Sequence, residues 1–448
     1  MMYYDITDLI NHSRFTHKVS GIQRVVLEGL KGTLEDAIPF FISPLTGKTY
    51  ICKNFKDVDL SDLKVFENIW VECELLKLSS NENIVNYFNK YLEKKPKYFK
   101  LRNFFKLLFQ IPIINTLIYL ILKLYIKKKF SFLKTGLNYE EIDYFPNNSS
   151  IAMFGGLWNF QKEYEILLSK LDSSIKKIVL VYDMIPIYSY FVPDELKIMF
   201  ERYIPFVLNN FSHVIVNANS TKLDIEKYIE ENNLPTPHIY VIHLAHILND
   251  NKLSISTVKL RTRKLFVEKY ILCVGSIESR KNHINLLNMW YRYVNSDSYS
   301  NEKLVIAGRW LWDAEIIQQF LTYTGHVFGS VIIIENPDDN ELTALYKNCK
   351  YTVYPSHYEG WGLPLGESLG FRKPCIHFDN SSLKEAGYNL TISIDYLNYD
   401  EFYKEMIKLL KDENYYTEIV NNINKNYAKL RNWNSFSTEI KSLLSKLD

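Results

Sequence analysis

The chain of 448 residues has few cysteines, and none of them are closely spaced. There is no Cys-x-x-Cys pair and no cluster of cysteine with histidine. Structural zinc sites and disulfide frameworks depend on such spacings. Because three of the cysteines lie in apolar runs typical of buried strands, the sequence favours reduced, packed thiols in a reducing compartment. The five residues are Cys52, Cys73, Cys273, Cys349 and Cys375.

An excess of charge of one sign is also missing. The chain has 53 Lys and Arg against 51 Asp and Glu, a formal net charge of +2. This balance argues against a general affinity for nucleic acid. The first residues, MMYYDITDLINHSRF, lack the basic and then apolar plan of a signal peptide. We therefore expect a cytoplasmic protein, long enough for two domains with full cores.

Short apolar runs rich in β-branched residues recur in the second half of the chain, separated by amphipathic stretches of helical length. This alternation is typical of βαβ units with a parallel sheet. Near-continuous apolar runs predict strands that are covered on both faces of the sheet. The second half is therefore expected to be a Rossmann-like domain. Its predicted strands are 270–276, 303–309, 331–336, 350–356 and 373–379.

The first half repeats this pattern less regularly. Residues 20–30 predict a helix, and three apolar runs predict strands that end in polar or glycine-containing turns. A polar stretch without periodicity marks a boundary near 245–268. The predicted fold class is α/β, with two Rossmann-like domains, 1–245 and 246–448, that face one another across a cleft. The last helix can pack back on the first domain. The three strands are 150–156, 176–186 and 213–220.

Residues of about 50–148 do not follow the α/β rhythm and are expected to be an insertion. Within it, segment 94–134 is rich in lysine, has no acidic residue and surrounds the apolar run 107–122. A spanning helix needs roughly 20 apolar residues, and this run is shorter and interrupted by polar residues and a proline. We interpret the segment as an element of the membrane interface, with lysines on an anionic surface. A buried hairpin and a spanning helix are the less favoured alternatives.

Two glutamates, Glu359 and Glu367, flank the glycine-containing stretch EGWGLPLGE that follows a predicted strand. Paired carboxylates about 5–10 Å apart can hydrolyse a glycoside. Gly360 and Gly362, however, permit a close approach of the backbone, and Pro364 suits the first turn of a helix. The pair therefore stands at the entrance of a helix at the end of a strand, where ligands bind in such sheets.

The start of that helix would present backbone N–H groups around Leu363 and Leu365, which suit a phosphate. Glu367, about one turn further, can accept hydrogen bonds from both hydroxyls of a ribose. Arg280 and Lys281 follow another strand of the same sheet, and their fork and point charge suit a diphosphate. A solvated basic pair at a helix start is the alternative for these two. Taken together, a nucleotide fits better than a bare glycoside.

The same stretches resemble a known family. EGWGLPLGE resembles the E-x7-E element of retaining glycosyltransferases with the GT-B fold, in particular glycosyltransferase family 4. VGSIESRKNHINLL resembles the phosphate segment of that family, and SSLKEAG resembles the stretch after the glutamates. DITDL, SGIQRVV and VYDMIP are similar to bacterial members that build surface polysaccharides. The resemblance covers most of 1–50 and 150–400.

The resemblance implies an acceptor domain in 1–245 and a nucleotide-sugar-binding domain in 246–448. Arg280 and Lys281 would neutralise the departing diphosphate. Glu359 would contact the donor sugar, and Glu367 would hold the ribose. Gly21 would let the backbone of the first domain come close to the phosphates.

One position departs from the family pattern. Some members have His-Asp where this chain has Tyr182 and Asp183, so the role of that histidine is not carried over to Tyr182. Asp183 either orients the acceptor hydroxyl or caps the turn after its strand. His17, His243 and His357 are alternative polar groups.

The implied reaction moves a hexose from a nucleoside diphosphate sugar to a hydroxyl of a lipid-linked glycan or of a lipopolysaccharide or capsule precursor, with retained configuration. GDP-mannose is the first donor to consider, before UDP-hexose and dTDP-rhamnose. No Asp-x-Asp run follows a predicted strand, and Asp338 and Asp339 open a helix, so neither metal nor cofactor is expected. The expected location is the inner face of the cytoplasmic membrane. Rival classes are a sugar-nucleotide epimerase and a non-catalytic scaffold of a polysaccharide-assembly complex.

Overall fold

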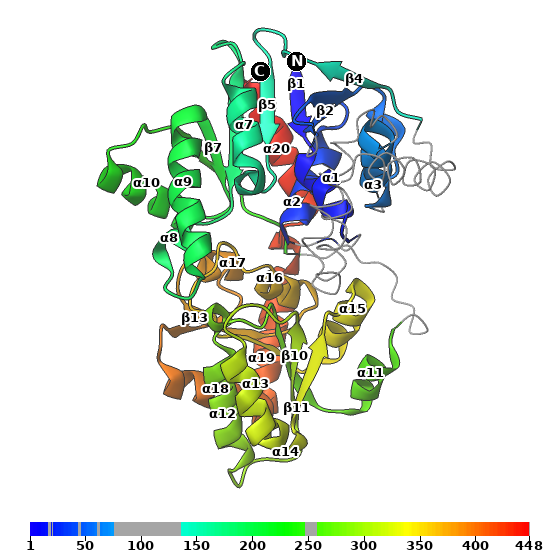
Figure 1. Cartoon of the computed structure of the whole chain (residues 1–448). Coiled ribbons are helices and arrows are strands. Elements are labelled where there is room, and N and C mark those ends of the chain that lie inside the picture. The colour runs from blue at the N-terminus through cyan, green and yellow to red at the C-terminus, as the bar shows by residue number, and fades with distance from the viewer. Residues whose placement is uncertain are drawn as a thin grey trace, which may run out of the picture. The chain divides into compact units, whose positions relative to one another are not determined.

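The computed structural model describes residues 1–16, 19, 21–43, 46–60, 63–75, 136–246 and 258–447 (Figure 1). The chain divides into two compact units, Met1–Ile178 with Ile440–Asp448, and Val179–Glu439. The predicted membrane-interface segment 94–134 and His17 lie outside the described residues. Among the helices that are described, none is both long and apolar enough to cross a bilayer.

The first sheet has eight strands in the order β4-β3-β2-β1-β5-β6-β7-β8. β1 pairs in parallel with β2 and β5, whereas β3 and β4 extend the sheet in antiparallel fashion. The three strands predicted in this half are confirmed. The strands are β1 (Met2–Asp5), β2 (Ala37–Ile42), β3 (Thr49–Cys52), β4 (Tyr139–Ile142), β5 (Ser150–Met153), β6 (Lys176–Val181), β7 (His213–Val216) and β8 (His238–Val241).

The flanks of the predicted insertion belong to this sheet. β3 and β4 are four residues each and pair with one another, Thr49 opposite Ile142. The sequence did not indicate either strand, because both are short and β4 carries two glutamates at its centre. The helices of this half are α1 (Thr7–Ser13), α2 (Gly21–Thr33), α3 (Lys64–Trp70), α7 (Gln161–Leu168), α8 (Ile185–Tyr188), α9 (Asp194–Asn210) and α10 (Asn219–Asn232).

The second sheet has six parallel strands in the order β11-β10-β9-β12-β13-β14. Numbered along the chain from β9, this is the order 3-2-1-4-5-6 of doubly wound dinucleotide-binding folds. All five predicted strands are present, and the sixth, β14, was missed because it is short and only partly buried. The strands are β9 (Tyr270–Val274), β10 (Lys303–Gly308), β11 (Val331–Glu335), β12 (Thr352–Tyr354), β13 (Cys375–Asp379) and β14 (Ile392–Asp395).

Both faces of this sheet are buried, as the apolar runs predicted. Along β9, Ile271 and Cys273 join the core on one face, whereas Tyr270 and Leu272 join the core on the other. This is the alternation of a strand with two covered faces. Figure 1 shows the helices α12 and α18 close together on this unit. The helices are α11 (Leu260–Arg263), α12 (His283–Val294), α13 (Glu315–Tyr323), α14 (Gly325–Gly329), α15 (Asp339–Asn348), α16 (Leu363–Gly370), α17 (Leu383–Gly387), α18 (Tyr399–Lys411), α19 (Glu413–Asn426) and α20 (Trp433–Leu447).

The cysteines behave as expected, since all five are buried and none forms a disulfide. One glycine fixes the carboxyl ends of the central strands. A Cβ at Gly308 would lie 1.7 Å from the carbonyl oxygen of Gly275, so only glycine fits where β10 passes the end of β9. This close approach sets the backbone from which Arg280 and Lys281 extend.

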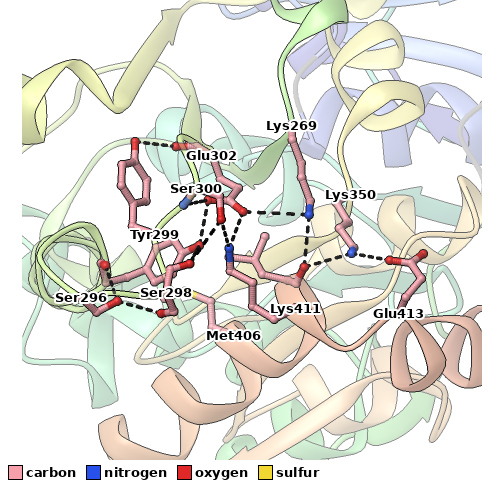
Figure 2. Close-up of polar contacts among 12 residues, drawn as sticks. Lys269, Ser296, Ser298, Tyr299, Ser300, Glu302, Lys350, Met406, Lys411 and Glu413 are labelled. Atoms are coloured by element: carbon pink, nitrogen blue, oxygen red, sulfur yellow. Dashed lines mark hydrogen bonds and ion pairs between the residues drawn. The ribbon is translucent and has the colours of Figure 1, made fainter.

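A buried glutamate organises the opposite, amino-terminal edge of the sheet (Figure 2). Glu302 is the residue directly before β10. Its carboxylate accepts hydrogen bonds from Tyr293 Oη at 2.8 Å, from Lys411 Nζ at 2.8 Å and from the amide of Ser300 at 2.9 Å. Burial alone would raise the pKa of Glu302, but the bonds from Lys411 and Tyr293 outweigh it and hold the pKa at about 2. Glu302 is therefore ionised at neutral pH.

Two further lysines at this edge fix the end of α18 (Figure 2). Lys269 and Lys350 precede β9 and β12, and each donates to the carbonyl of Leu410, at 3.3 and 3.1 Å. Lys350 also pairs with the exposed carboxylate of Glu413 at 2.9 Å. The strand starts and the last turn of α18 are thus held together by charge-assisted bonds to a helix C-terminus.

We predict that Glu302→Gln lowers the melting temperature at pH 7 by several degrees, because bonds to a charged group contribute about 1.5–3 kcal/mol. The folded pKa lies below the ordinary 4.5, so this stability is fully present above about pH 5 and is lost as the pH falls towards 2. The difference between the melting temperatures of the two proteins should narrow as the pH falls from 7 to 3. Glu413→Gln, whose side chain is 73% exposed, is the control and should cost under about 1 kcal/mol. Equal losses in the two variants, or a gap that does not change with pH, would contradict this.

Candidate functional site

The candidate site lies where the strand order of the second sheet reverses. β9 and β12 are neighbours at the centre of this sheet, and each is followed by a polar loop. In open α/β sheets, ligands bind beyond the carboxyl ends of the strands at such a point. Arg280 and Lys281 extend from a short turn after β9, Ser279–Lys281, and Glu359 follows β12.

Glu359 is the centre of a buried ion-pair cluster. Its Oε1 lies 3.0 Å from Arg280 Nη1 and 2.5 Å from Lys281 Nζ. The three side chains are only 8–11% exposed. The backbone of Glu359 is fixed as well, since its amide donates to Ser381 Oγ at 2.9 Å and its carbonyl accepts from Ser382 Oγ at 2.9 Å. The structure thus brings together three residues that the sequence singled out.

The charges of this cluster depend on one another. Burial alone would raise the pKa of Glu359, but Arg280 and Lys281 outweigh it and hold the pKa at about 2. Burial lowers the pKa of Lys281, and Glu359 partly opposes this. For Arg280, the carboxylates overcome burial and raise the pKa of the guanidinium. Glu359 is therefore ionised at neutral pH, and removing any one member would leave an uncompensated buried charge.

Each cation has a second partner that the sequence did not reveal. Arg280 Nη2 pairs with Glu278 Oε1 at 2.5 Å, and its Nη1 donates to the carbonyl of Tyr358 at 2.6 Å. Lys281 Nζ donates to the hydroxyl of Tyr354 at 2.6 Å. Glu278 is a charged residue directly after a predicted strand, a signal that was available. Tyr354 is the last residue of β12, and the apolar run around it in the sequence indicates only a core position.

Asp183 joins this cluster from the loop after β6. Gly360 packs so closely that a Cβ there would lie 2.7 Å from the carbonyl oxygen of Tyr182 and 2.8 Å from Asp183 Cβ. Asp183 Oδ1 accepts the amide of Ile185 at 3.0 Å, so the carboxylate does cap its own turn. Burial raises the pKa of Asp183 to about 6, although Arg280 acts against this. Asp183 is thus close enough to the cations to take part in the same site.

The turn after Glu359 leads into α16 as predicted. Gly362 has φ +95°, and a Cβ there would lie 2.6 Å from Leu383 Cδ2, so glycine is required. Pro364 lies in the first turn. Leu363 is the first helical residue, and its amide has no partner within the helix. The amide of Leu365 donates to the carbonyl of Gly362 at 3.0 Å and is therefore already used within the turn.

A buried tyrosine forms a hydrogen bond to the carboxylate of Glu367. Tyr346 of α15 donates its hydroxyl to Glu367 Oε2 at 2.9 Å and approaches the carbonyl of Pro364 at 3.2 Å. Its ring stacks on Phe371, with centroids 5.2 Å apart and an angle of 9° between the planes. The sequence indicated Glu367 but not Tyr346, because the bond joins two helices that are distant in the chain.

The remaining predicted residues are Gly21, in the first unit, and two histidines that pack on aromatic rings. Gly21 is the first residue of α2, an exposed position of the first unit. The ring of His243 lies 4.9 Å from that of Trp361, which is buried as the sequence suggested. His357 stacks on Phe191 at 4.2 Å. Over the described ranges, no group of three His, Cys, Asp or Glu residues is arranged to hold a metal ion.

The cations, the N-terminus of α16 and the Glu367 carboxylate together determine which ligand the site suits. Buried cations after β9, beside the loop that follows β12, favour an anion, and the N-terminus of α16 adds to the attraction. A positioned carboxylate on α16 can accept hydrogen bonds from hydroxyl groups. The combination suits a ligand that has phosphate and a polyol side by side.

Part of the chain is similar to known sequences. Residues 261–426 match the family "Glycosyl transferases group 1". O-antigen chain mannosyltransferase B of Escherichia coli is 27% identical over 180 residues, 40% of this chain and 46% of that protein. O-antigen chain mannosyltransferase RfbU of Salmonella typhimurium is 27% identical over 226 residues, 50% of this chain and 57% of that protein. These matches span about half the length of each relative.

Solved structures extend the likeness to nearly the whole chain. HepE of Anabaena, in complex with UDP-glucose, has a TM-score of 0.60 at 11% identity, with 99% of both chains covered. Sucrose-phosphate synthase of Thermosynechococcus elongatus has a TM-score of 0.59 at 12% identity, with 100% of this chain and 98% of that one covered. The predicted α/β class with two domains is confirmed. Residues 261–426 match the glycosyl transferases group 1 family, and the chain has the two-domain α/β fold, GT-B, of these solved structures.

Proposed function

We propose that the protein is a retaining hexosyltransferase of the family 4 type, which moves a hexose from a nucleoside diphosphate sugar to a hydroxyl of a glycan precursor. One observation carries this proposal. Arg280, Lys281 and Glu359 converge at the switch point of the second sheet, inside the glycosyl transferases group 1 domain. A buried pair of cations at that point is suited to the diphosphate of the donor.

The roles of the residues follow from their positions. Arg280 and Lys281 hold the diphosphate and stabilise the charge that grows on it as it departs. Glu367, fixed by Tyr346, accepts hydrogen bonds from the ribose hydroxyls. Glu359 lies one turn before α16 and contacts the hexose. Because the cations supply the charge stabilisation, the proposed reaction uses neither a metal ion nor a cofactor.

The relatives suggest the sugar and the acceptor. Two of them are named as mannosyltransferases of the O-antigen chain, which favours GDP-mannose as the donor. HepE is known in complex with UDP-glucose, which keeps UDP-hexose as the alternative. By the same likeness, we propose that the acceptor is a surface polysaccharide precursor on a lipid carrier, used at the inner face of the cytoplasmic membrane.

In the proposed reaction, the bond from the anomeric carbon to the diphosphate oxygen breaks as the bond to the acceptor oxygen forms on the same face. The acceptor proton passes to the departing phosphate oxygen, so that no protein base is consumed. Asp183, close to Glu359 and the cations, is placed to orient the acceptor hydroxyl. NMR of the product tests the stereochemistry, and an inverted anomeric configuration would contradict this step.

The function is tested with purified protein, a panel of nucleotide sugars and lipid-linked acceptors. Lys281→Ala and Glu367→Ala should each reduce hexose transfer by about 100-fold or more, since removal of one stabilising group in such sites has this effect. Lys384→Ala is the control, because this lysine is 63% exposed and its ion pair is with Asp379, which does not belong to the cluster. Full activity in both site variants would refute the assignment. An altered free sugar nucleotide formed without an acceptor would instead indicate an epimerase.

We further predict that Tyr346→Phe weakens nucleotide binding by about tenfold, because Glu367 loses a hydrogen bond to a charged group. The stack on Phe371 is retained, so the fold should survive. Preference for ribonucleotides over 2′-deoxyribonucleotides should also decline, as measured by calorimetric titration. Tyr351→Phe is the matched control, since this buried tyrosine bonds to the carbonyl of Met406 at 2.5 Å, away from the site. Unchanged affinity and unchanged preference in Tyr346→Phe would count against the ribose role of Glu367.

A further inference from the structure

The formal charges of the buried cluster cancel before any ligand arrives. Arg280 and Lys281 are two cations, and Glu278 and Glu359 are two carboxylates within 3.0 Å of them. Asp183 adds a third carboxyl group, whose pKa burial raises to about 6. The site that is suited to a diphosphate therefore has no net positive charge to offer it.

This cancellation matters because the cluster is buried. Coulombic interactions are strong where water is excluded, so a multiply charged anion that approaches a neutral or negative cluster gains little. A diphosphate can form strong bonds to Arg280 and Lys281 only if a carboxylate leaves them. The question is which of the two carboxylates is exchanged.

The contacts distinguish the two. Glu278 is fully buried, and its ion pair among the described residues is with Arg280, two positions further along the chain. Glu359 uses a single oxygen, Oε1, to bind both cations at once. Its backbone is held by Ser381 and Ser382, so rotation of the side chain alone can withdraw the carboxylate from the cations.

The cations also keep their positions without Glu359. Lys281 retains the hydroxyl of Tyr354 at 2.6 Å. Arg280 retains Glu278 and the carbonyl of Tyr358. Each cation thus has one set of partners that fixes it and one shared partner, Glu359, in the place where an anionic ligand would bind.

We propose that the Glu359 carboxylate is an internal substitute for the diphosphate, which holds Arg280 and Lys281 in the unliganded protein and is displaced when the donor binds. This rests on the proposed function and adds a step to it. The displaced carboxylate becomes free to contact the hexose. Binding of the diphosphate and engagement of the sugar are therefore coupled through one side chain.

Glu359→Gln tests the proposal, because glutamine keeps the shape of the side chain and removes the competing charge. We expect the unliganded variant to melt at a lower temperature, because two buried cations lose a carboxylate. Titration with inorganic pyrophosphate should show binding about tenfold tighter than that of the wild type, because the anion no longer competes with a carboxylate. GDP and UDP are titrated in parallel, and hexose transfer should fall in the same variant.

Glu367→Gln is the matched control, as it removes a carboxylate from the same motif that does not contact the cations. It should weaken the binding of GDP or UDP and leave pyrophosphate binding unchanged. Glu359→Asp is the second variant, in case the glutamine substitution folds poorly. It keeps the charge but retracts the carboxylate by one methylene, so its affinity for pyrophosphate should lie between those of the wild type and Glu359→Gln.

The outcomes separate the two proposals. Pyrophosphate binding that is equal or weaker in both Glu359 variants overturns the displacement of Glu359, whether or not the protein transfers a sugar. Tighter pyrophosphate binding with no binding of any nucleotide to the wild type supports the displacement and contradicts the proposed function. Tighter binding together with nucleotide binding and lost transfer supports both.

Discussion

Two adjacent cations buried at the end of a parallel sheet are the constraint on which the rest of the site depends. Arg280 and Lys281 are almost removed from solvent, and uncompensated burial of such charges is very costly. Glu359 compensates both through one oxygen, and Glu278, Tyr354 and the carbonyl of Tyr358 fix their positions. The same arrangement that makes the unliganded protein stable gives it a place where a diphosphate can exchange with a carboxylate.

Three features of the fold support this cluster. The reversal of strand order places the loops after β9 and β12 next to each other. The close passage of Gly308 over Gly275 fixes the backbone before Arg280. At the opposite edge of the sheet, Glu302 and its lysines hold the strand starts to α18 (Figure 2).

The features of the fold and site that could be predicted from the sequence are those encoded within a short stretch of residues. The strands of the second sheet and the residues Arg280, Lys281, Glu359 and Glu367 follow from runs and spacings within short stretches. Glu278, Tyr346 and Tyr354 were missed because their roles come from bonds between segments that only folding brings together. The strands β3, β4 and β14 are too short to show a period. The role of Gly21 and the membrane segment 94–134 stay predictions.

A crystal structure of the protein with bound GDP or UDP would show whether the buried cations receive the diphosphate of a nucleotide donor. We predict that the diphosphate lies against Arg280 Nη1 and Lys281 Nζ, that Glu367 bonds to the ribose and that Glu359 has left the cations. A nucleotide bound away from the carboxyl ends of β9 and β12, with Glu359 still paired to both cations, would contradict the account.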